Sequence, residues 1–443
     1  MASLARTPGV EITLDWTAPQ DALTRLHDAP GALLMQGGSA SSAGRFSYLT
    51  AFPEFSVVED DPAAGFNRLR REHRPSATPV GPGFSGGYAG LLSYDLGRAF
   101  ERLSRLDGGI ARWPAVAMNW YGAALVFDHE ARTLAVRGEA GAAARLADAV
   151  GGPARPLKAG PGALAQVWDD ARYLDAARRA IAYVRAGDVF QVNLSHPFRG
   201  SVAGADAPAA LAHALAGSSP AAFSAYLRLD ADRAVVTNSP ERFVRVDEAG
   251  AVETRPIKGT AARRADPGED AAAKAALARS LKDRAENLMI VDLMRNDLAR
   301  VCAPGSVRVP DLYAVESYAN VHHLVSTVTG RLAEGRDVFD LLAASFPPGS
   351  ITGAPKPRAM EIIAELEGES RGPYCGALGW IGPDGAADFN VMIRTAAMVR
   401  NGDSWTCEVR SGGAITIESD PLAELEETRA KAGALAHAIE TLA

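Results

Sequence analysis

The stretch 376-GALGWIGPDGAADFNVMIRTAAMVRNGDSWTCEVRSGGAITI-417 decides the fold class, because three strand-like runs follow one another within it. The runs are 376–382, 389–399 and 405–417, and no helical stretch separates them. Strands that follow one another directly are typical of antiparallel sheets, whereas parallel sheets need a helix between strands. The sequence therefore predicts an α+β fold with antiparallel sheets. Other strand-like runs are 188-DVFQVNLSHPF-198, 234-AVVTN-238 and 321-VHHLVSTVTG-330.

Helical periodicity occurs between these groups of strands. The stretch 169-DDARYLDAARRAIAYVRAG-187 combines an acidic first turn with a glycine at its end. Asp420 ahead of Pro421 is a good N-cap for a final helix. Besides 169–187, helices are predicted at 269–300, 337–345, 356–368 and 421–441.

A chain of 443 residues exceeds the length over which a single hydrophobic core keeps growing, so more than one subdomain is expected. Residues 1 to about 137 carry short apolar runs broken by Gly, Pro and Ser, which is typical of a sheet with tight turns. The best linker is 150-VGGPARPLKAGPG-162, which has few large apolar residues. We therefore predict an N-terminal subdomain over 1–150 and a second, larger domain over 163–443.

Composition excludes several classes of function. The chain is 47% hydrophobic and carries a net charge of -7, so it is neither disordered nor suited to nucleic acid. Three cysteines are too few and too scattered for a disulfide framework or a zinc site. The start, MASLARTPGVEITLDW, has no apolar run typical of a secretory signal, and the longest apolar stretch, 115–127, is too short to cross a bilayer. We expect a cytoplasmic protein without a membrane or nucleic-acid partner.

Carboxylates on two predicted helices form a candidate metal site. Glu286 lies near the start of 284-RAENLMIVDLMRNDLAR-300, where a glutamate can simply favour the helix dipole. Glu424, Glu427 and Lys431 share one stripe of the last helix, which a solvated row of salt bridges would also explain. Carboxylates from two facing helices would suit Mg²⁺, which prefers oxygen ligands. Spacing alone leaves these alternatives open.

Cationic and small residues form a second set of candidates. Lys258 in 255-RPIKGTAARR-264 is a nucleophile, a charge that holds an anionic substrate, or a surface cation. Arg394 interrupts an apolar strand-like run, so it either forms a buried salt bridge or binds a substrate carboxylate. His323 is a core histidine or a catalyst. The backbone of 349-GSITGAPKPRAMEIIAELE-367 could bind an anion where its helix begins.

Seven ordered motifs together resemble the chorismate-utilising enzymes, a family that includes anthranilate, aminodeoxychorismate, isochorismate and salicylate synthases. The resemblance runs from about residue 30 almost to the end. It implies two large packed antiparallel β-sheets with helices on the outside, and a chorismate-binding catalytic domain over 163–443. The motifs are 238-NSPERF-243, 255-RPIKGT-260, 286-ENLMIVDLMRNDLAR-300, 322-HHLVS-326, 349-GSITGAPKPRAMEII-363, 372-GPYCGALGWIGPDGAADFNVMIRT-395 and 424-ELEETRAKA-432.

The resemblance also assigns site residues. It implies that Glu286 and Glu427 bind Mg²⁺, that Glu424 lines the same site, and that the metal holds the ring carboxylate of chorismate. His323 matches the active-site histidine of the family. The positions that match substrate contacts are Gly259, Thr260, Tyr374, Arg394, Gly412 and Gly413, and Gln191 and Lys431 are expected to line the same substrate site.

Two positions distinguish the branches of the family. The water-using isochorismate and salicylate synthases carry a lysine base where this chain has Gln191, and a glutamine cannot deprotonate water. Anthranilate synthases have alanine where this chain has Lys258. The resemblance therefore implies a C4 amination that gives 4-amino-4-deoxychorismate for p-aminobenzoate and folate, with Lys258 as nucleophile and Glu241 as acid/base. The alternatives are C2 amination, as in anthranilate synthase component I, and a non-catalytic chorismate-binding subunit.

The chemistry sets two further expectations. A nucleophilic Lys258 needs a lowered pKa, from partial burial or from cations such as Arg255. Ammonia requires a source, and none of the three cysteines lies on the G-x-C-x-G elbow of a glutaminase, so a separate glutamine amidotransferase subunit is expected. The family's tryptophan-binding segments correspond to 33-LLMQ-36 and 219-SPAAF-223, both altered here, so we expect no inhibition by tryptophan.

Overall fold

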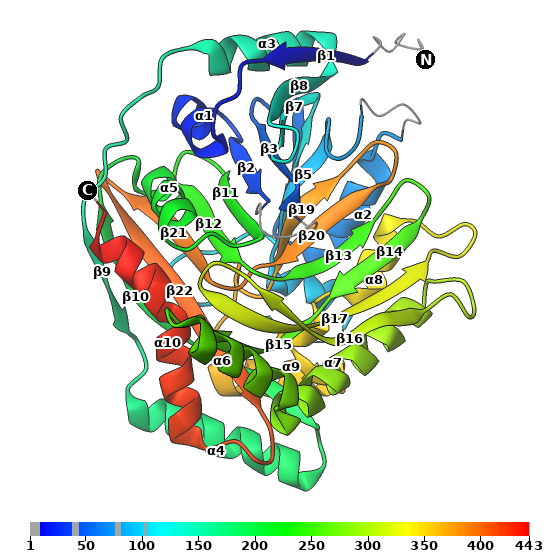
Figure 1. Cartoon of the computed structure of the whole chain (residues 1–443), viewed down its shortest axis with the longest axis vertical. Coiled ribbons are helices and arrows are strands. Elements are labelled where there is room, and N and C mark those ends of the chain that lie inside the picture. Colours follow the sequence, from blue (N-terminus) through cyan, green and yellow to red (C-terminus); the bar gives the residue numbers. More distant parts are fainter. Residues whose placement is uncertain (1–8, 38–43, 76–80, 102, 104, 443) are drawn as a thin grey trace.

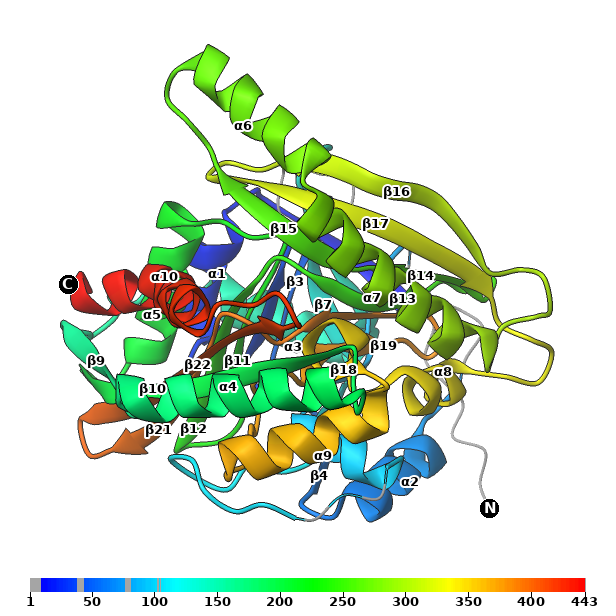
Figure 2. The ribbon, with the colours of Figure 1, turned by 90° about the horizontal axis from the view of Figure 1, so that it is seen from below.

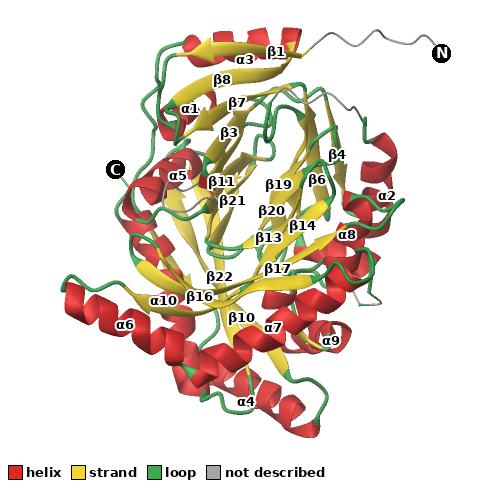
Figure 3. Ribbon diagram, turned by 45° about the vertical axis from the view of Figure 1, so that its right-hand side comes forward, coloured by secondary structure: helices red, strands yellow, loops and turns green. Residues whose placement is uncertain are grey.

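The computed structural model describes residues 9–37, 44–75, 81–101, 103 and 105–442. In this part of the chain two large sheets pack face to face, every strand pair is antiparallel, and the helices lie outside (Figures 1 and 3). The predicted α+β fold with two packed antiparallel sheets is therefore confirmed.

The first sheet contains the longest strands of the C-terminal region. Its strands run in the order β1 (Gly9–Leu14), β8 (Thr133–Glu139), β7 (Ala123–Asp128), β3 (Phe46–Thr50), β2 (Leu33–Gln36), β11 (Phe223–Arg228), β12 (Arg233–Ser239), β21 (Thr395–Asn401), β22 (Ser404–Ile415), β10 (Gln191–Ala203) and β18 (Gly353–Ala354), with β9 (Gly162–Gln166) also paired to β10.

The second sheet carries the strand of the Pro-Ile-Lys-Gly-Thr motif at its edge. Its strands run in the order β15 (Ile257–Ala262), β17 (Val321–Arg331), β14 (Ala251–Arg255), β13 (Arg242–Val246), β20 (Ala387–Val391), β19 (Ala377–Ile381), β5 (Gly87–Leu92), β6 (Val116–Tyr121) and β4 (Phe55–Glu59), with β16 (Arg308–Ser317) also paired to β17.

A shared apolar core fills the space between the sheets. Leu227 and Val235 of the first sheet lie in one buried cluster with Leu91, Leu378 and Trp380 of the second. Removing this much apolar surface from water is the main force that holds the two sheets together.

Helices cover the outer faces of both sheets. On the first sheet, α3 (Ala140–Gly151) packs on the end formed by β1, β8 and β7, whereas α1 (Pro19–Leu26) and α5 (Ala207–Ser218) cover its middle. Toward the other end, α10 (Pro421–Glu440) packs on β22 and β9, and α4 (Asp170–Ala186) and α9 (Lys356–Glu367) cover β10. On the second sheet lie α2 (Pro62–Glu72), α7 (Leu281–Ala299) and α8 (Val338–Ser345). Two short 3-10 helices are η2 (Tyr94–Ala99) and η3 (Gly349–Ile351).

Local signals explain where several helices begin and end. Asp169 caps α4 by accepting from the Arg172 amide, and Gly187 ends it with φ of 82°. Asp420 caps α10 by accepting from the Ala423 amide, as predicted. Residues 152–161, inside the predicted linker, form no helix or strand.

Two predicted elements were wrong in their continuity. The helix expected over 269–300 is two helices, α6 (Pro267–Arg279) and α7, because the Ser280 side chain accepts from the Asp283 amide and begins a new helix there. The strand expected over 389–399 is broken between β20 and β21, where Arg394 has φ of 50°. A bulky residue in this left-handed conformation cannot continue a strand.

Within the described ranges, no helix is both long enough and apolar enough to span a bilayer. The first half of the N-terminal stretch examined for a signal, residues 1–8, lies outside the described residues.

Candidate active site

The predicted site residues come together where the edges of the two sheets meet. Seen from below, β15 and α7 lie on one side of this region, and β22, α10, β10 and β18 lie on the other (Figure 2). The 3-10 helix η3 contacts both α7 and β18, so it lies between the two sides. Segments more than 200 residues apart in the chain therefore form one site.

Lys258 points inward from β15 toward η3. Its Nζ donates to the carbonyl of Ser350 over 3.1 Å. Burial lowers the pKa of Lys258, the carboxylates of Glu286 and Glu241 oppose this shift, and Lys431 adds to it. The lowered pKa and its cause in burial were predicted, whereas Arg255 is not among the charges that act on Lys258 and is instead paired with Glu316.

Glu241 is buried in the turn between β12 and β13, close to Lys258. Burial raises its pKa to about 7, although a hydrogen bond with the Ser350 side chain and the charge of Lys258 act in the opposite direction. Ser350 therefore contacts Lys258 through its carbonyl and Glu241 through its side chain. A lysine with a lowered pKa beside a carboxyl with a raised pKa is a pair suited to nucleophilic and acid chemistry near neutral pH.

The three predicted metal ligands lie near one another. Glu286 is in the second turn of α7, so its interpretation as a first-turn residue is wrong, and Asp283 occupies the first turn instead. Burial raises the pKa of Glu286 and of Glu424, and the charge of Glu424 adds to the shift of Glu286. Glu427 is half-exposed and is paired with Lys431 at 2.7 Å, which lowers its pKa despite partial burial.

This donor set fits a hard divalent cation in its chemistry, because like charges held together are stabilised by a metal. The carboxylates are, however, too far apart in this structure to ligate one ion together. Across the described ranges, no group of three or more His, Cys, Asp or Glu residues is close enough to hold an ion. Lysines balance the carboxylates instead, since Lys282 lies 4.0 Å from Glu286 and Lys431 pairs with Glu427.

Thr260 and His323 form a polar pair across the adjacent strands β15 and β17. The Thr260 hydroxyl lies 2.9 Å from Nδ1 of His323. Burial and the nearby charge of Arg394 lower the pKa of His323 to about 4, so the ring is neutral near pH 7. Gly259 has φ of 88°, and a Cβ there would lie 2.9 Å from the Asp283 side chain, so this irregular position of β15 favours glycine.

Arg394 lies at the break between β20 and β21 rather than inside a strand. Burial lowers its pKa, and among the described residues no carboxylate is paired with it. The buried salt bridge considered from sequence is therefore absent from this part of the chain. A half-buried arginine held at an unfavourable φ without an anion is a candidate for binding a substrate carboxylate.

The glycine pair of β22 lies against α10. The Gly412 carbonyl accepts from Nζ of Lys431 over 3.0 Å. A Cβ on Gly413 would lie 3.0 Å from Oε2 of Glu424, so a side chain here would push on a predicted metal ligand. Both glycines and Lys431 therefore lie beside the carboxylates, and their roles as substrate contacts stay a prediction.

Tyr374 and Gln191 are both buried. The Tyr374 ring lies 5.8 Å from the guanidinium of Arg371, and burial raises the pKa of its phenol. The side-chain oxygen of Gln191 has no hydrogen-bond partner within the described part of the chain. A buried acceptor without a partner is costly, so it is available to a substrate or nucleophile.

Sequence reasoning missed two residues of this region. Ser350 was included only as part of a possible anion-binding loop, but it contacts Lys258 and Glu241 directly. Arg371 was not singled out at all, although it is buried and contacts several site segments. Arg371 lies in the polar, turn-like stretch 367-EGESRGPY-374, so nothing local in the sequence indicates its burial. Asn287 bridges α7 to β17 by accepting from Ser326 and donating to the Leu324 carbonyl.

A separate cavity lies between the sheets, and none of the residues predicted for the active site lines it. The altered segments 33–36 and 219–223 both contribute to it, through Met35, Gln36 and Phe223 among others. The expected insensitivity to tryptophan stays a prediction.

Comparisons with known proteins agree on one family. A family model described as chorismate binding enzyme matches residues 42–437. The chain is 40% identical to aminodeoxychorismate synthase component 1 of Klebsiella aerogenes, over 97% of this chain and 99% of that protein. It is 38% identical to anthranilate synthase component 1 of Streptomyces coelicolor, over 99% of this chain and 90% of that protein.

A solved structure shares the same architecture. The crystal structure of anthranilate synthase component I from Streptococcus pneumoniae superposes with a TM-score of 0.79 at 28% identity, covering 89% of this chain and 93% of that one. Together with the family model, which spans most of the sequence, these similarities show that the chain belongs to the chorismate binding enzyme family.

Proposed function

We propose that this protein is the synthase component of an aminodeoxychorismate synthase. It converts chorismate and ammonia to 4-amino-4-deoxychorismate and water, in the cytoplasm, as a step toward p-aminobenzoate and folate. The observation that carries the proposal is Lys258, an amine with a lowered pKa that lies beside the protonatable Glu241 and shares Ser350 with it.

In the first step, the neutral amine of Lys258 attacks ring C2 of chorismate. The ring double bonds shift, and the C4–O bond breaks. Glu241 gives its proton to the departing hydroxyl, which leaves as water. The lowered pKa of Lys258 supplies the neutral amine, and the raised pKa of Glu241 supplies the acid.

In the second step, ammonia attacks C4. The double bonds shift back, the bond between C2 and the Lys258 nitrogen breaks, and lysine leaves as the neutral amine. The new C4 ammonium returns one proton to Glu241, so the enzyme ends in its starting state. Ammonia rather than water is the nucleophile because Gln191 cannot act as a base.

Other side chains orient the substrate. Arg394 is placed to bind a carboxylate of chorismate through its planar guanidinium. His323, neutral and fixed by Thr260, is placed to hydrogen-bond the substrate. Mg²⁺, held by Glu286, Glu427 and Glu424, would neutralise the ring carboxylate of chorismate when bound.

Ammonia would come from a separate glutamine amidotransferase subunit. The relative from Klebsiella aerogenes is named as component 1, which supports a second component. The second candidate function is C2 amination, supported by the similarity to anthranilate synthase component 1 of Streptomyces coelicolor. Lys258 favours C4 over C2, because a lysine at this position can occupy C2 covalently.

The test is to identify the product made by the purified protein from chorismate, Mg²⁺ and an ammonium salt. We expect 4-amino-4-deoxychorismate, detected by mass spectrometry and by conversion to p-aminobenzoate with an added lyase. Anthranilate as the sole product would establish the second candidate, and chorismate binding without turnover would indicate a non-catalytic subunit.

A further inference from the structure

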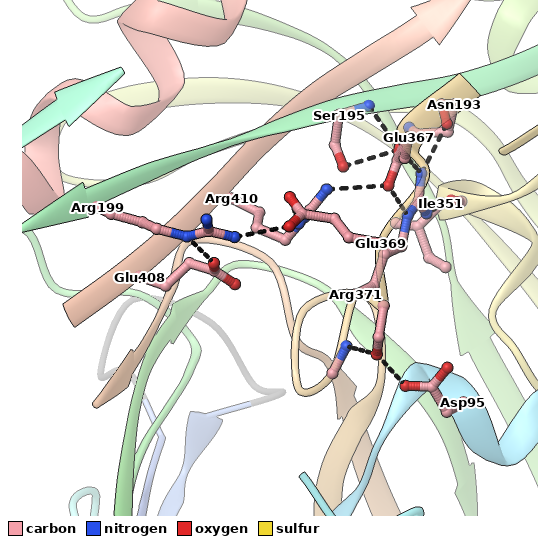
Figure 4. Close-up of polar contacts among 12 residues, drawn as sticks. Asp95, Asn193, Ser195, Arg199, Ile351, Glu367, Glu369, Arg371, Glu408 and Arg410 are labelled. Carbon is pink, nitrogen blue, oxygen red and sulfur yellow. Dashed lines mark hydrogen bonds and ion pairs between the residues drawn. The ribbon is translucent and has the colours of Figure 1, made fainter. Parts of the chain in front are cut away.

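A buried ionic cluster centred on Glu367 joins α9 to β10 and β22 (Figure 4). Glu367 at the end of α9 is bound by two arginines. Arg371 donates to both of its oxygens, over 3.0 and 2.6 Å, and Arg410 of β22 donates over 3.2 Å. Ser195 of β10 completes the shell through its amide at 2.8 Å and its hydroxyl at 2.9 Å.

Arg371 uses its remaining donors on the backbone of two segments that line the site. Its Nη1 donates to the Ile351 carbonyl over 3.0 Å, and its Nη2 donates to the Asn193 carbonyl over 2.8 Å. Ile351 directly follows Ser350, the residue that contacts Lys258 and Glu241. Asn193 is two residues beyond Gln191 on the same strand.

Two aromatic rings lie near the same guanidinium. Arg371 lies 4.9 Å from the ring of Tyr94 and 5.8 Å from that of Tyr374, a predicted substrate contact. One buried side chain is therefore bound to η3, to β10 and to the turn that carries Tyr374. A guanidinium can do this because it presents five N–H donors in a rigid plane, whereas a lysine ammonium presents three from a single point.

Stability alone is a poor explanation for this cluster. A buried ion pair often contributes no more stability than an apolar replacement of similar shape, because its charges must be removed from water. Here the pair also fixes two backbone carbonyls in space. The cluster therefore fixes the position of the Ser350 segment relative to β10.

We propose that Arg371, oriented by Glu367, is a positioning residue that sets the place of Ser350 and thereby aligns Lys258 and Glu241 with the ring of chorismate. The inference rests on the proposed function for its kinetic consequence. Its structural content, the ordering of 349–354 by Arg371, is independent of which product the enzyme makes.

Two variants test it, with a matched control in the same cluster. Arg371→Lys keeps the charge but loses the multiple donors, and Glu367→Asp keeps the charge but retracts the carboxylate that orients Arg371. Arg199→Lys is the control, because Arg199 bonds Glu369 and Glu408 at the outer end of the cluster and none of the proposed site residues. Kinetics with chorismate and ammonium, thermal unfolding, and hydrogen–deuterium exchange of 349–354 are measured for each.

We expect kcat to fall about 10- to 100-fold in both test variants, the size of effect that displacing a reacting group by about 1 Å produces. KM for ammonium should change by less than about threefold, Arg199→Lys should resemble the wild type, and 349–354 should exchange faster only in the test variants. If Arg371→Lys does not fold, the kcat and the hydrogen–deuterium exchange of Glu367→Asp decide whether the inference holds.

An unchanged kcat in a folded test variant, or an equal loss in Arg199→Lys, would overturn the inference. If the wild type does not aminate chorismate, the proposed function fails, but exchange still decides the positioning role: unchanged exchange of 349–354 refutes it, and faster exchange supports it.

Discussion

Lys258 and Glu241 show how one physical cause can prepare two different reactants. Burial favours the neutral form of each group, so the amine becomes available as a nucleophile and the carboxyl keeps a proton to donate. Sequence could single out Lys258 from its motif, but it could not give this environment, because burial depends on how distant segments pack. The contacts by which Ser350 links the two were found only in the structure.

Glu241→Gln should abolish protonation of the leaving hydroxyl while stabilising the protein at alkaline pH. The folded-state pKa of about 7 exceeds the ordinary 4.5, so between these values the folded protein holds a proton that the unfolded chain has lost. Stability of the wild type therefore falls as pH rises from 4.5 to 7. We expect the variant to gain up to about 3 kcal/mol in unfolding free energy at pH 8 and little at pH 4, measured by urea denaturation. A loss of stability at pH 8 would contradict this account.

Arg394→Met should raise KM for chorismate without destabilising the fold. Loss of a charge-assisted, forked contact to a carboxylate predicts an increase of about 10- to 100-fold. Because Arg394 has no carboxylate partner among the described residues, its removal should leave the unfolding free energy unchanged or raise it by about 1 kcal/mol.

The control for this variant is Arg400→Met, which removes a partly exposed arginine from β21, the strand that follows Arg394. The role assigned to Arg394 is wrong if its substitution destabilises the protein and leaves KM at the wild-type value.

At the scale of elements, the helices that carry the site are locked together by a buried ion pair. Lys356 at the start of α9 donates to Asp297 of α7 over 2.8 Å and to the carbonyl of Ser345 at the end of α8 over 2.7 Å. Periodicity predicted these helices, because their apolar faces recur at helical spacing. It could not place the break at Ser280 or the bend at Arg394, because a hydroxyl cap and a left-handed residue leave the apolar pattern unchanged.

Lys356→Met should be destabilising, because it removes the buried cation of Asp297 and leaves only the half-exposed Arg300, 3.0 Å away, to balance that carboxylate. Breaking a buried pair from one side costs about 3–5 kcal/mol, and the remaining pair with Arg300 reduces this cost. The double variant Lys356→Met/Asp297→Asn should recover much of this loss, since it removes the uncompensated charge. Unfolding free energies from denaturant titrations check both, with the exposed Lys274→Met as control. A cost of less than about 1 kcal/mol for Lys356→Met would show that the pair is not important for the packing of α7.

At the scale of the whole molecule, the N-terminal strands are continuous with both sheets. β2 pairs with β11 in the first sheet, and β5 pairs with β19 in the second. The antiparallel class could be predicted from the succession of strands, but these long-range pairings could not, because nothing local specifies a partner so far away in the chain. The division into 1–150 and 163–443 stays a prediction about sequence organisation.

The whole chain should use ammonium salts but not glutamine as its nitrogen source. None of its cysteines lies on a glutaminase elbow, and burial raises the pKa of the Cys375 thiol to about 11, so it is a poor nucleophile. We expect no aminated product from chorismate and glutamine until a glutamine amidotransferase subunit is added. Product formation from glutamine by the highly purified chain alone would refute the two-subunit arrangement.

The most direct test of the central claim compares the ring position of amination in the wild type and in Lys258→Ala. Both proteins are supplied with chorismate, Mg²⁺ and ¹⁵N-ammonium, and the labelled carbon is identified by NMR. We predict that the wild type places nitrogen on C4 and that the variant makes no C4 product, leaving at most slow amination at C2. Amination of C4 by Lys258→Ala at the rate of the wild type would contradict the account.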